Sequence, residues 1–413
     1  MPQFTLIQDI KEILLCSTMP LPFLKGEAMS ALPSCKNAYL IIEDGKIHSF
    51  GSMNDIPNLR FEKIVSANNG YIFPSWVDSH THLVFAAWRE QEFMDRIEGL
   101  SYEEISRRGG GILNSAKKIA EISESELYDI SYTRLQKLIK SGTGAIEIKS
   151  GYGLSVESEL KILRVIKRLK ENSPIPIKST FLGAHSFPLE YRLNHSGYVD
   201  LIIHEMLPEI AKQSLADYCD VFCEKNFFSV EETREILLAA QKYGLDSRIH
   251  TNQFTHSGGI PLSVEINAKS VDHLEELNSE EIKLLKESNV IPCLLPGAAF
   301  FMNCPFPPAT NMLAEGLGFC IATDFNPGTC PIWDMKTIYH LSVIKMRLNS
   351  HQALSAMTIN GAHALDLENQ CGSIFPSAFA NFIITHEVPS LAYLAYAIND
   401  HWISKVFVNG QEL

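Results

Sequence analysis

Between residues 71 and 365, short runs of apolar and β-branched residues alternate with longer amphipathic stretches. This alternation is typical of βα units, which build a parallel sheet. Eight strand candidates can be counted, at residues 76–85, 144–152, 177–186, 218–224, 247–254, 270–277, 290–298 and 319–328. Helical patterns lie between them, notably at 156–170, 229–244 and 278–288, and each opens near a Ser or Asn that could cap it. Eight such units predict a closed (β/α)8 barrel over residues 71–365.

A doubly wound open sheet is the alternative fold. It would need a Gly-rich phosphate-binding turn after the first strand, whereas residues 78–83 read Asp-Ser-His-Thr-His-Leu. The one Gly-rich stretch, residues 107–118, follows a helical pattern and is therefore predicted to be a loop rather than a nucleotide site.

The two ends of the chain carry a different pattern. Apolar runs flank Asp-Gly within residues 38–51, and a similar signal with Asn-Gly closes the chain at 404–413. Both dipeptides favour tight β-hairpins. We therefore expect residues 1–70 and 366–413 to pair into one small β-sandwich-like domain, with the barrel inserted between them.

Composition narrows the class of protein. The chain has 35 basic and 48 acidic residues and a formal charge of −13, with no dense basic run, so nucleic acid is not an expected partner. Its nine cysteines are scattered, with no Cys-x-x-Cys pair, which is typical of reduced thiols in the cytoplasm. The N-terminus does not resemble a signal peptide, and no run of about 18 apolar residues predicts a membrane span.

Metal-competent residues close several predicted strands. His80 and His82 lie two apart at the end of the first strand, where both imidazoles could face one ion. With 14 histidines in the chain, one such pair is not far from a chance event. His250, His273 and Asp324, however, each lie near the carboxyl end of another strand, where a (β/α)8 barrel gathers its active site.

Taken singly, each of these side chains is adequately explained as a satisfied polar residue at a strand end. Together they indicate a metal site, because inward-facing strand positions are otherwise expected to be apolar. Neutral imidazoles with a carboxylate suit Zn²⁺ or an iron ion, with one coordination position left for water.

Other candidates are weaker. Arg89 follows the first strand and could be a solvated surface charge or a clamp for a substrate carboxylate, since guanidinium binds carboxylates bidentately. Nine further histidines fall in helical, turn or terminal contexts and receive no role: His48, His195, His204, His256, His340, His351, His363, His386 and His401.

The order of His-x-His followed by His, His and Asp on later strands resembles the amidohydrolase superfamily. Longer stretches resemble the imidazolonepropionase family within it. They are PSWVDSHTHLVFA, RIEGLSYEEISRRGGGILNS, AIEIKSGYGL, FLGAHSFP, SVDHLEEL and ATDFNPGTCP, and they occur in this order over nearly the whole chain.

The resemblance implies a cytoplasmic homodimer that hydrolyses the cyclic amide of 4-imidazolone-5-propanoate to N-formimidoyl-L-glutamate, a step of histidine degradation. It implies one zinc or iron ion per subunit, bound by His80, His82, His250 and Asp324. It also implies a substrate carboxylate on Arg89. The substrate contacts that it implies around the ring and the amino-acid end are Tyr152, His185, Asn326, Gly328 and Thr329.

One position departs from the family. Three residues after His250 the family commonly has Glu, whereas this chain has Gln253. A Gln amide cannot titrate, so the usual general base is missing. We hypothesise that Asp324 or His273 accepts the proton of the attacking water and that one of them returns it to the ring nitrogen. Gln253 would orient the ring, and His185 would donate to the developing oxyanion.

Two other functions remain open at this point. A related amidohydrolase or deaminase acting on another heterocyclic ring would use the same metal site but would have no need of Arg89. The third possibility is a catalytically silent barrel that binds metal as a structural support or acts as a binding module. The reason to consider it is that position 253 has Gln instead of Glu.

Overall fold

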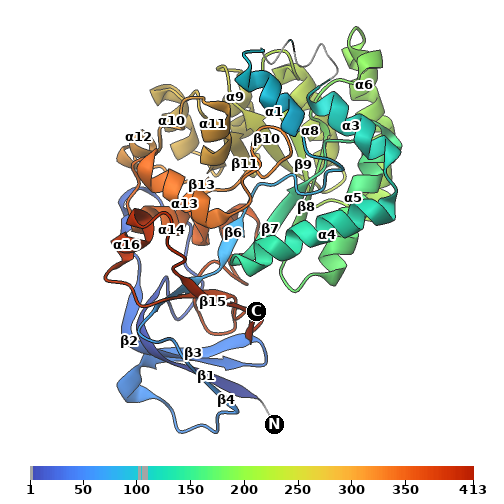
Figure 1. The fold of residues 1–413 in the computed structure, drawn as a ribbon. Coiled ribbons are helices and arrows are strands. Elements are labelled where there is room, and N and C mark those ends of the chain that lie inside the picture. Colours follow the sequence, from blue (N-terminus) through green and yellow to red (C-terminus); the bar gives the residue numbers. More distant parts are fainter. Residues whose placement is uncertain (1–2, 101–103, 105–109) are drawn as a thin grey trace.

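The computed structural model describes residues 3–100, 104 and 110–413. Two parts are visible: a barrel of strands surrounded by helices, and a second sheet, also of eight strands, that holds both chain ends (Figure 1). No helix within the described ranges is both long and apolar enough to cross a membrane.

The barrel sheet contains eight parallel strands, and they follow one another in chain order around the sheet. Each falls within or within one residue of a predicted strand, so the predicted barrel is confirmed. The strands are β6 (Trp76–Asp78), β7 (Thr143–Lys149), β8 (Ile177–Ala184), β9 (Tyr218–Cys223), β10 (Asp246–Thr251), β11 (Ser270–His273), β12 (Ile291–Leu294) and β13 (Cys320–Ile321).

The helices pack mainly outside the strands (Figure 1). They are α1 (Glu90–Ile97), α3 (Ile112–Glu121), α4 (Glu124–Lys140), α5 (Val156–Asn172), α6 (His195–Leu201), α7 (Leu207–Gln213), α8 (Val230–Gln241), α9 (Gly259–Glu265), α10 (Ser279–Lys286), α11 (Pro296–Met302), α12 (Ala309–Ala314), α13 (Met335–Ile344), α14 (Ser350–Met357), α15 (Ile359–Ala364) and α16 (Leu391–Tyr396). Short turns of 3-10 helix lie at Gly26–Ser30, Met53–Asp55 and Leu189–Tyr191, and a π-helical turn at Ile202–Met206.

The three predicted caps are present. The side chains of Ser155, Ser229 and Asn278 accept hydrogen bonds from backbone N–H groups in the first turns of α5, α8 and α10. Each cap satisfies donors that have no partner within the helix.

The Gly-rich stretch is partly helical, not a loop. Residues 107–109 lie outside the described part of the chain, but α3 begins at Ile112. Gly111 precedes it with φ 77°, a conformation that glycine adopts without strain, and the Gly111 N–H donates to the Glu92 carboxylate.

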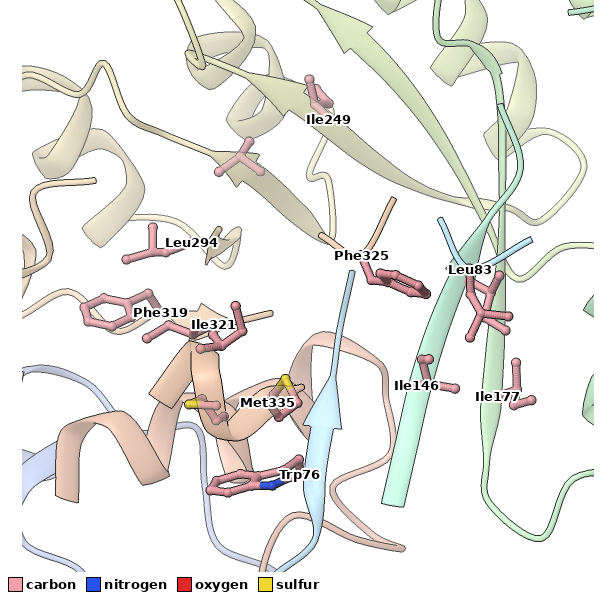
Figure 2. Packing of buried hydrophobic residues seen from close by; sticks show 14 of the residues in the cluster. Trp76, Leu83, Ile146, Ile177, Ile249, Leu294, Phe319, Ile321, Phe325 and Met335 are labelled. Atoms are coloured by element: carbon pink, nitrogen blue, oxygen red, sulfur yellow. The ribbon is translucent and has the colours of Figure 1, made fainter. Parts of the chain in front are cut away.

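Alternate residues of the barrel strands face opposite sides. In β7, Ile146 and Ile148 belong to the apolar cluster outside the strands, and Glu147 and Lys149, which alternate with them in sequence, are fully buried. Figure 2 shows part of this cluster, including Ile146, Ile249 and Leu294 from three strands. The helices therefore pack on apolar side chains, while charged side chains occupy the inside of the barrel.

The barrel is closed by irregular chain rather than by a ladder. β6 and β13, the first and last strands, have three and two residues and do not form a ladder with each other. Beyond them, Thr81 and Phe325 form an isolated bridge, with hydrogen bonds from His82 N to Phe325 O (2.8 Å) and from Asp324 N to His80 O (3.0 Å). The first predicted strand thus ends at Asp78, and His80 and His82 follow it instead of lying on it.

The second sheet is mixed and joins the two chain ends, as predicted. Its order is β16-β15-β14-β5-β1-β2-β3, with β4 also paired to β1. The strands are β1 (Phe4–Leu14), β2 (Ser34–Glu43), β3 (Lys46–Ser52), β4 (Lys63–Ser66), β5 (Tyr71–Pro74), β14 (Phe382–Thr385), β15 (Ile403–Val408) and β16 (Gln411–Glu412). Both predicted hairpins form, and their turns at Asp44-Gly45 and Asn409-Gly410 have positive φ at both residues, as a type I′ turn requires.

Candidate metal centre and active site

Three imidazoles and a carboxylate converge where the barrel closes. Asp324 Oδ1 lies 3.4 Å from His80 Nε2 and 3.6 Å from His82 Nε2. The rings of His80 and His250 have centroids 4.6 Å apart, and those of His82 and His250 are 5.7 Å apart. The four predicted ligands, from three regions distant in sequence, therefore form one buried cluster.

The backbone at this end of the barrel is strained. Asn252, His273 and Asp324 follow or end three strands and have φ of 55°, 92° and 53°. Non-glycine residues rarely adopt positive φ, and each such residue costs about 1–3 kcal/mol unless its surroundings hold it there. Strain of this kind is typical of functional sites.

The donor set fits a cation. Among the described residues, His80 Nε2, His82 Nδ1 and both ring nitrogens of His250 are buried and have no hydrogen-bond partner. His80, His82 and Asp324 each offer one ligand atom, and these atoms lie within 4.8 Å of one another. Burial is the largest cause that lowers the pKa of His82 well below its ordinary value, and the neighbouring imidazoles lower it further. The ring is therefore neutral and keeps a lone pair. Nitrogen lone pairs beside a carboxylate are the ligands that Zn²⁺ and iron accept.

Two buried carboxylates contact the ring nitrogens of two of the predicted ligands. His80 Nδ1 lies 2.7 Å from Asp272 Oδ2, and His250 Nδ1 lies 3.0 Å from Asp220 Oδ2. Burial opposes ionisation of both carboxyls, but nearby cations outweigh it, and the pKa of each is lowered. A carboxylate on Nδ1 fixes the ring orientation and directs Nε2 at the ion, as in many metal sites.

Asp324 is supported through its neighbour. Asp78, at the end of β6, accepts hydrogen bonds from the Thr323 N–H (2.9 Å) and hydroxyl (2.8 Å). Burial raises the pKa of Asp78 to about 7, although both hydrogen bonds from Thr323 act against it. Asp78 therefore ties the first strand to the segment that carries Asp324.

His273 lies beside the four ligands. Its ring centroid is 5.4 Å from that of His250 and 6.0 Å from that of His80. Its Nδ1 lies 3.5 Å from Glu275 Oε1, a long contact with a buried carboxyl whose pKa is raised by burial. The structure thus brings His273 to the same cluster.

Tyr152 and His185 form an aromatic wall next to His82. The ring of His185 stacks on His82 at 5.2 Å, and Tyr152 lies 5.6 Å from His82 and 5.4 Å from His185. The Nδ1 of His185 donates to the Gly151 carbonyl at 3.0 Å. In the neutral ring, Nε2 is consequently an acceptor.

Arg89 reaches the same cavity from the loop before α1. It is 8% exposed, and its Nε donates to Glu92 Oε2 at 2.8 Å. Gly328 packs so closely on the guanidinium that a Cβ there would lie 2.3 Å from Arg89 Cζ. Gly328 itself does not line the cavity, so the structure places it against Arg89 rather than in the wall.

Gln253, in the loop after β10, lines the cavity and is held by a carboxylate that the sequence analysis missed. Glu224, directly after β9, accepts hydrogen bonds from the N–H groups of Gln253, Phe254 and Thr255 and from the Thr255 hydroxyl. The loop that presents Gln253 is therefore fixed by one buried side chain.

Asn326 and Thr329 also line the cavity, but Asn326 is occupied by its own loop. Its Oδ1 accepts from the N–H groups of Gly328, Thr329 and Cys330 at 2.7–3.3 Å, and its Nδ2 donates to Asp324 O at 2.8 Å. It organises the loop after β13.

The complete described lining is His82, Arg89, Ile112, Tyr152, His185, Phe222, Phe227, His250, Gln253, Phe254, His273, Met302, Asp324, Asn326 and Thr329. None of the nine histidines set aside in the sequence analysis is among these residues. The apolar members Ile112, Phe222, Phe227, Phe254 and Met302 were missed, and no sequence signal separates them from core residues. The buried charged residues next to the site could have been recognised in the sequence, because they interrupt otherwise apolar strands. They are Glu147, Lys149, Asp220 and Asp272.

Residues 71–413 match the amidohydrolase family. Solved structures agree with the fold: guanine deaminase of E. coli superposes with a TM-score of 0.71 at 13% identity, covering 100% of this chain and 99% of that chain. An adenosine deaminase from Xanthomonas campestris with bound zinc superposes with a TM-score of 0.68 at 15% identity, over 99% and 92% of the two chains. The family match defines an amidohydrolase, and the barrel agrees with it.

Sequence relatives narrow the class. The imidazolonepropionases of Flavobacterium johnsoniae and Christiangramia forsetii are 50% and 48% identical, each covering 98% of this chain and 99% of the relative. The imidazolonepropionase of Clostridium tetani is 40% identical over 98% of this chain and 97% of its own length. The chain belongs to the imidazolonepropionase family of cyclic amide hydrolases.

Proposed function

We propose that the protein hydrolyses 4-imidazolone-5-propanoate to N-formimidoyl-L-glutamate, a step of histidine degradation. The observation that carries the proposal is one cavity lined by both the imidazole and carboxylate cluster and the buried Arg89. A ring amide at the cluster and a carboxylate on the guanidinium are the two ends of this substrate.

We assign ion binding to His80, His82, His250 and Asp324. The assignment is supported by two overlapping groups whose ligand atoms lie within 4.8 Å of one another, His80 with His82 and Asp324, and His80 with His250 and His273. A single zinc or iron ion bound there would polarise the amide carbonyl and lower the pKa of water from about 15.7 toward roughly 7. Metal analysis of the purified protein identifies the ion and its number per chain.

The chain's own groups orient the ring and move the protons. Arg89 binds the propionate carboxylate, and the Gln253 amide hydrogen-bonds the ring. Tyr152 packs beside the ring, and His185, with Nδ1 committed to Gly151, presents Nε2 to a ring N–H instead of donating to the oxyanion. This assignment replaces the donor role expected from the sequence.

Asp324 and His273 are the groups that can transfer the proton without a Glu at position 253. One accepts the proton of the water that attacks the carbonyl carbon, and the same proton is delivered to the ring nitrogen as the C–N bond breaks. Asn326 and Thr329 line the cavity, and the loop that carries them also places Gly328 against Arg89.

The test is to incubate purified, metal-analysed protein with imidazolonepropionate and to follow the loss of the ring's ultraviolet absorbance, with formimidoylglutamate as product. Protein that contains metal but shows no turnover would support the silent barrel instead. An Arg89→Met variant separates the remaining alternative, because an enzyme for a neutral ring would be insensitive to it.

We further propose a cytoplasmic homodimer. Each chain would be divided into a small domain of residues 1–70 plus 366–413 and a barrel of 71–365, with β5 (Tyr71–Pro74) at the boundary paired into the sheet of the small domain. The family resemblance supports the dimer, and nine free cysteines are consistent with a reducing compartment. Light scattering during size-exclusion chromatography measures the oligomer.

A further inference from the structure

One buried lysine contacts three carboxylates directly beneath the imidazole cluster. Lys149 is the last residue of β7, and its Nζ lies 2.7 Å from Asp220 Oδ2, 2.9 Å from Glu147 Oε1 and 3.4 Å from Asp272 Oδ2. All four side chains are fully buried. An ammonium group has three N–H donors, so the number of carboxylates matches the number of protons that Lys149 can donate.

Two of these carboxylates each hold a ligand imidazole. Asp272 contacts Nδ1 of His80 at 2.7 Å, and Asp220 contacts Nδ1 of His250 at 3.0 Å. Asp220 also accepts the backbone N–H of His250 at 3.2 Å. In both aspartates the oxygen that contacts the imidazole is Oδ2, which is also the oxygen that Lys149 approaches.

The third carboxylate holds the chain between the paired histidines. Glu147 Oε2 accepts the N–H of Thr81 at 3.3 Å, and the Thr81 hydroxyl donates to the Glu147 carbonyl at 2.7 Å. Thr81 separates His80 from His82 in sequence, so the position of Glu147 affects both ligands.

We propose that Lys149 is a positioning residue for the metal centre, which sets the directions of His80 and His250 through Asp272 and Asp220. The inference rests on the proposed metal site. No ion pair or side-chain hydrogen bond of the described residues joins Lys149 to a ligand, so a carboxylate and an imidazole would separate it from a bound ion.

The neighbouring cation does not duplicate this role. Arg248 Nη2 lies 3.5 Å from Asp272 Oδ2, but its nearer contacts are the carbonyls of Ser79 (3.0 Å) and Ala364 (3.2 Å). In the described residues, Arg248 and Asp220 are backbone partners in β10 and β9, but no ion pair or side-chain hydrogen bond joins them. Lys149 is thus the cation that connects both aspartates.

The test measures Zn²⁺ affinity in the absence of substrate, by competition with a chromophoric chelator. We expect Lys149→Met to weaken Zn²⁺ binding by about 10–100-fold, the range typical for partners of metal ligands. The matched control is Lys269→Met: Lys269 pairs with Asp366, which holds no ligand, and we expect less than a twofold change. Wild-type affinity in Lys149→Met would overturn the proposal, as would wild-type protein that binds no Zn²⁺.

A double-mutant cycle tests the route. If Lys149 acts through Asp220, adding Lys149→Met to Asp220→Asn must weaken Zn²⁺ binding by a smaller factor than Lys149→Met does alone. Equal factors in both backgrounds would refute the route. A Co²⁺-loaded sample gives a second readout, because an altered ligand geometry changes the visible spectrum of the ion.

Loss of the lysine leaves three buried carboxylates without their common cation, and the single variant could fail to fold. The Lys149→Met/Glu147→Gln variant removes one positive and one negative charge together and is compared with Glu147→Gln. Weaker Zn²⁺ binding by tenfold or more supports the proposal, and equal binding contradicts it. Turnover of imidazolonepropionate by the wild type is measured separately, so failure of the proposed function leaves the affinity result interpretable.

Discussion

At the residue scale, the contact between Gly328 and Arg89 offers a test that leaves the arginine in place. A methyl group at 328 would occupy the position 2.3 Å from Arg89 Cζ, so Gly328→Ala must displace the guanidinium. Charge-assisted hydrogen bonds contribute about 1.5–3 kcal/mol, which corresponds to roughly 10–100-fold in binding. We expect KM for imidazolonepropionate to rise within this range, with a smaller change in kcat and an unchanged circular dichroism spectrum. An unchanged KM would show that Arg89 does not hold the carboxylate.

The proton-transfer groups are tested by their effect on kcat. We expect Asp324→Ala and His273→Ala to lower kcat by about 10²–10⁴-fold, because each removes a group that can move the proton. Gln253→Ala should raise KM more than it lowers kcat, since an amide only orients the ring. Metal content is determined for each variant, and near-full turnover of His273→Ala with metal present would exclude His273.

Gln253→Glu asks a separate question of the same position. If the chain simply lacks the family's base, restoring Glu should increase kcat. If proton transfer proceeds through Asp324 or His273, the substitution should change kcat little. The measurement is kcat at saturating substrate across a pH series.

At this scale the sequence was informative about groups that do chemistry and less so about groups that hold them. The cluster of His80, His82, His250, His273 and Asp324 could be predicted because so many metal-competent side chains rarely fall near the ends of several strands by chance, although each one alone could. Glu224 could not be found, because its role depends on the path of the loop after β10, which propensity does not specify. The tautomer of His185 depends on the Gly151 carbonyl and is likewise a property of the tertiary fold.

At the element scale, the loop from β7 to α5 is held by one carboxylate. Glu159, in the first turns of α5, accepts the N–H groups of Gly151, Gly153 and Leu154 at 2.6–3.0 Å and is fully buried. This loop carries Tyr152, and its Gly151 carbonyl accepts the hydrogen bond from Nδ1 of His185. The position of the aromatic wall therefore depends on a side chain that does not line the cavity.

Glu159→Gln should destabilise this element. An amide NH₂ would face at least one backbone N–H, leaving a buried donor unsatisfied at a cost of about 1–3 kcal/mol. We expect a lower free energy of unfolding in urea together with a raised KM. Glu157→Gln on the same helix is the control, because the Glu157 side chain is 76% exposed and its loss should change stability by less than about 0.5 kcal/mol.

Elements were predictable where local chemistry decides them. Capping residues, Asp-Gly and Asn-Gly turns and apolar periodicity are local, and the corresponding helices and hairpins are present. The first and last barrel strands were predicted too long. Residues 79–85 are as apolar and β-branched as a strand, but the chain leaves the ladder after Asp78 to bring His80 and His82 to Asp324.

At the scale of the whole molecule, the ion should contribute to stability. A ligand that binds only the folded state stabilises it by about 4 kcal/mol at a thousand times its Kd. We expect removal of metal by a chelator to lower the thermal midpoint by several degrees, and addition of Zn²⁺ or Fe²⁺ to restore it. Differential scanning calorimetry measures the change, and an identical midpoint with and without metal would contradict the assigned ligands.

The ring of eight strands is completed by the same two stretches that carry His80, His82 and Asp324, through one bridge, two backbone hydrogen bonds and the hydrogen bonds of Asp78 with Thr323. Closure therefore depends on backbone groups and on Asp78 rather than on the ligand side chains. A descendant that abandoned hydrolysis and lost these ligands would keep the backbone hydrogen bonds and is expected to stay closed. A closed barrel is consequently no sign that a protein of this ancestry still catalyses a reaction.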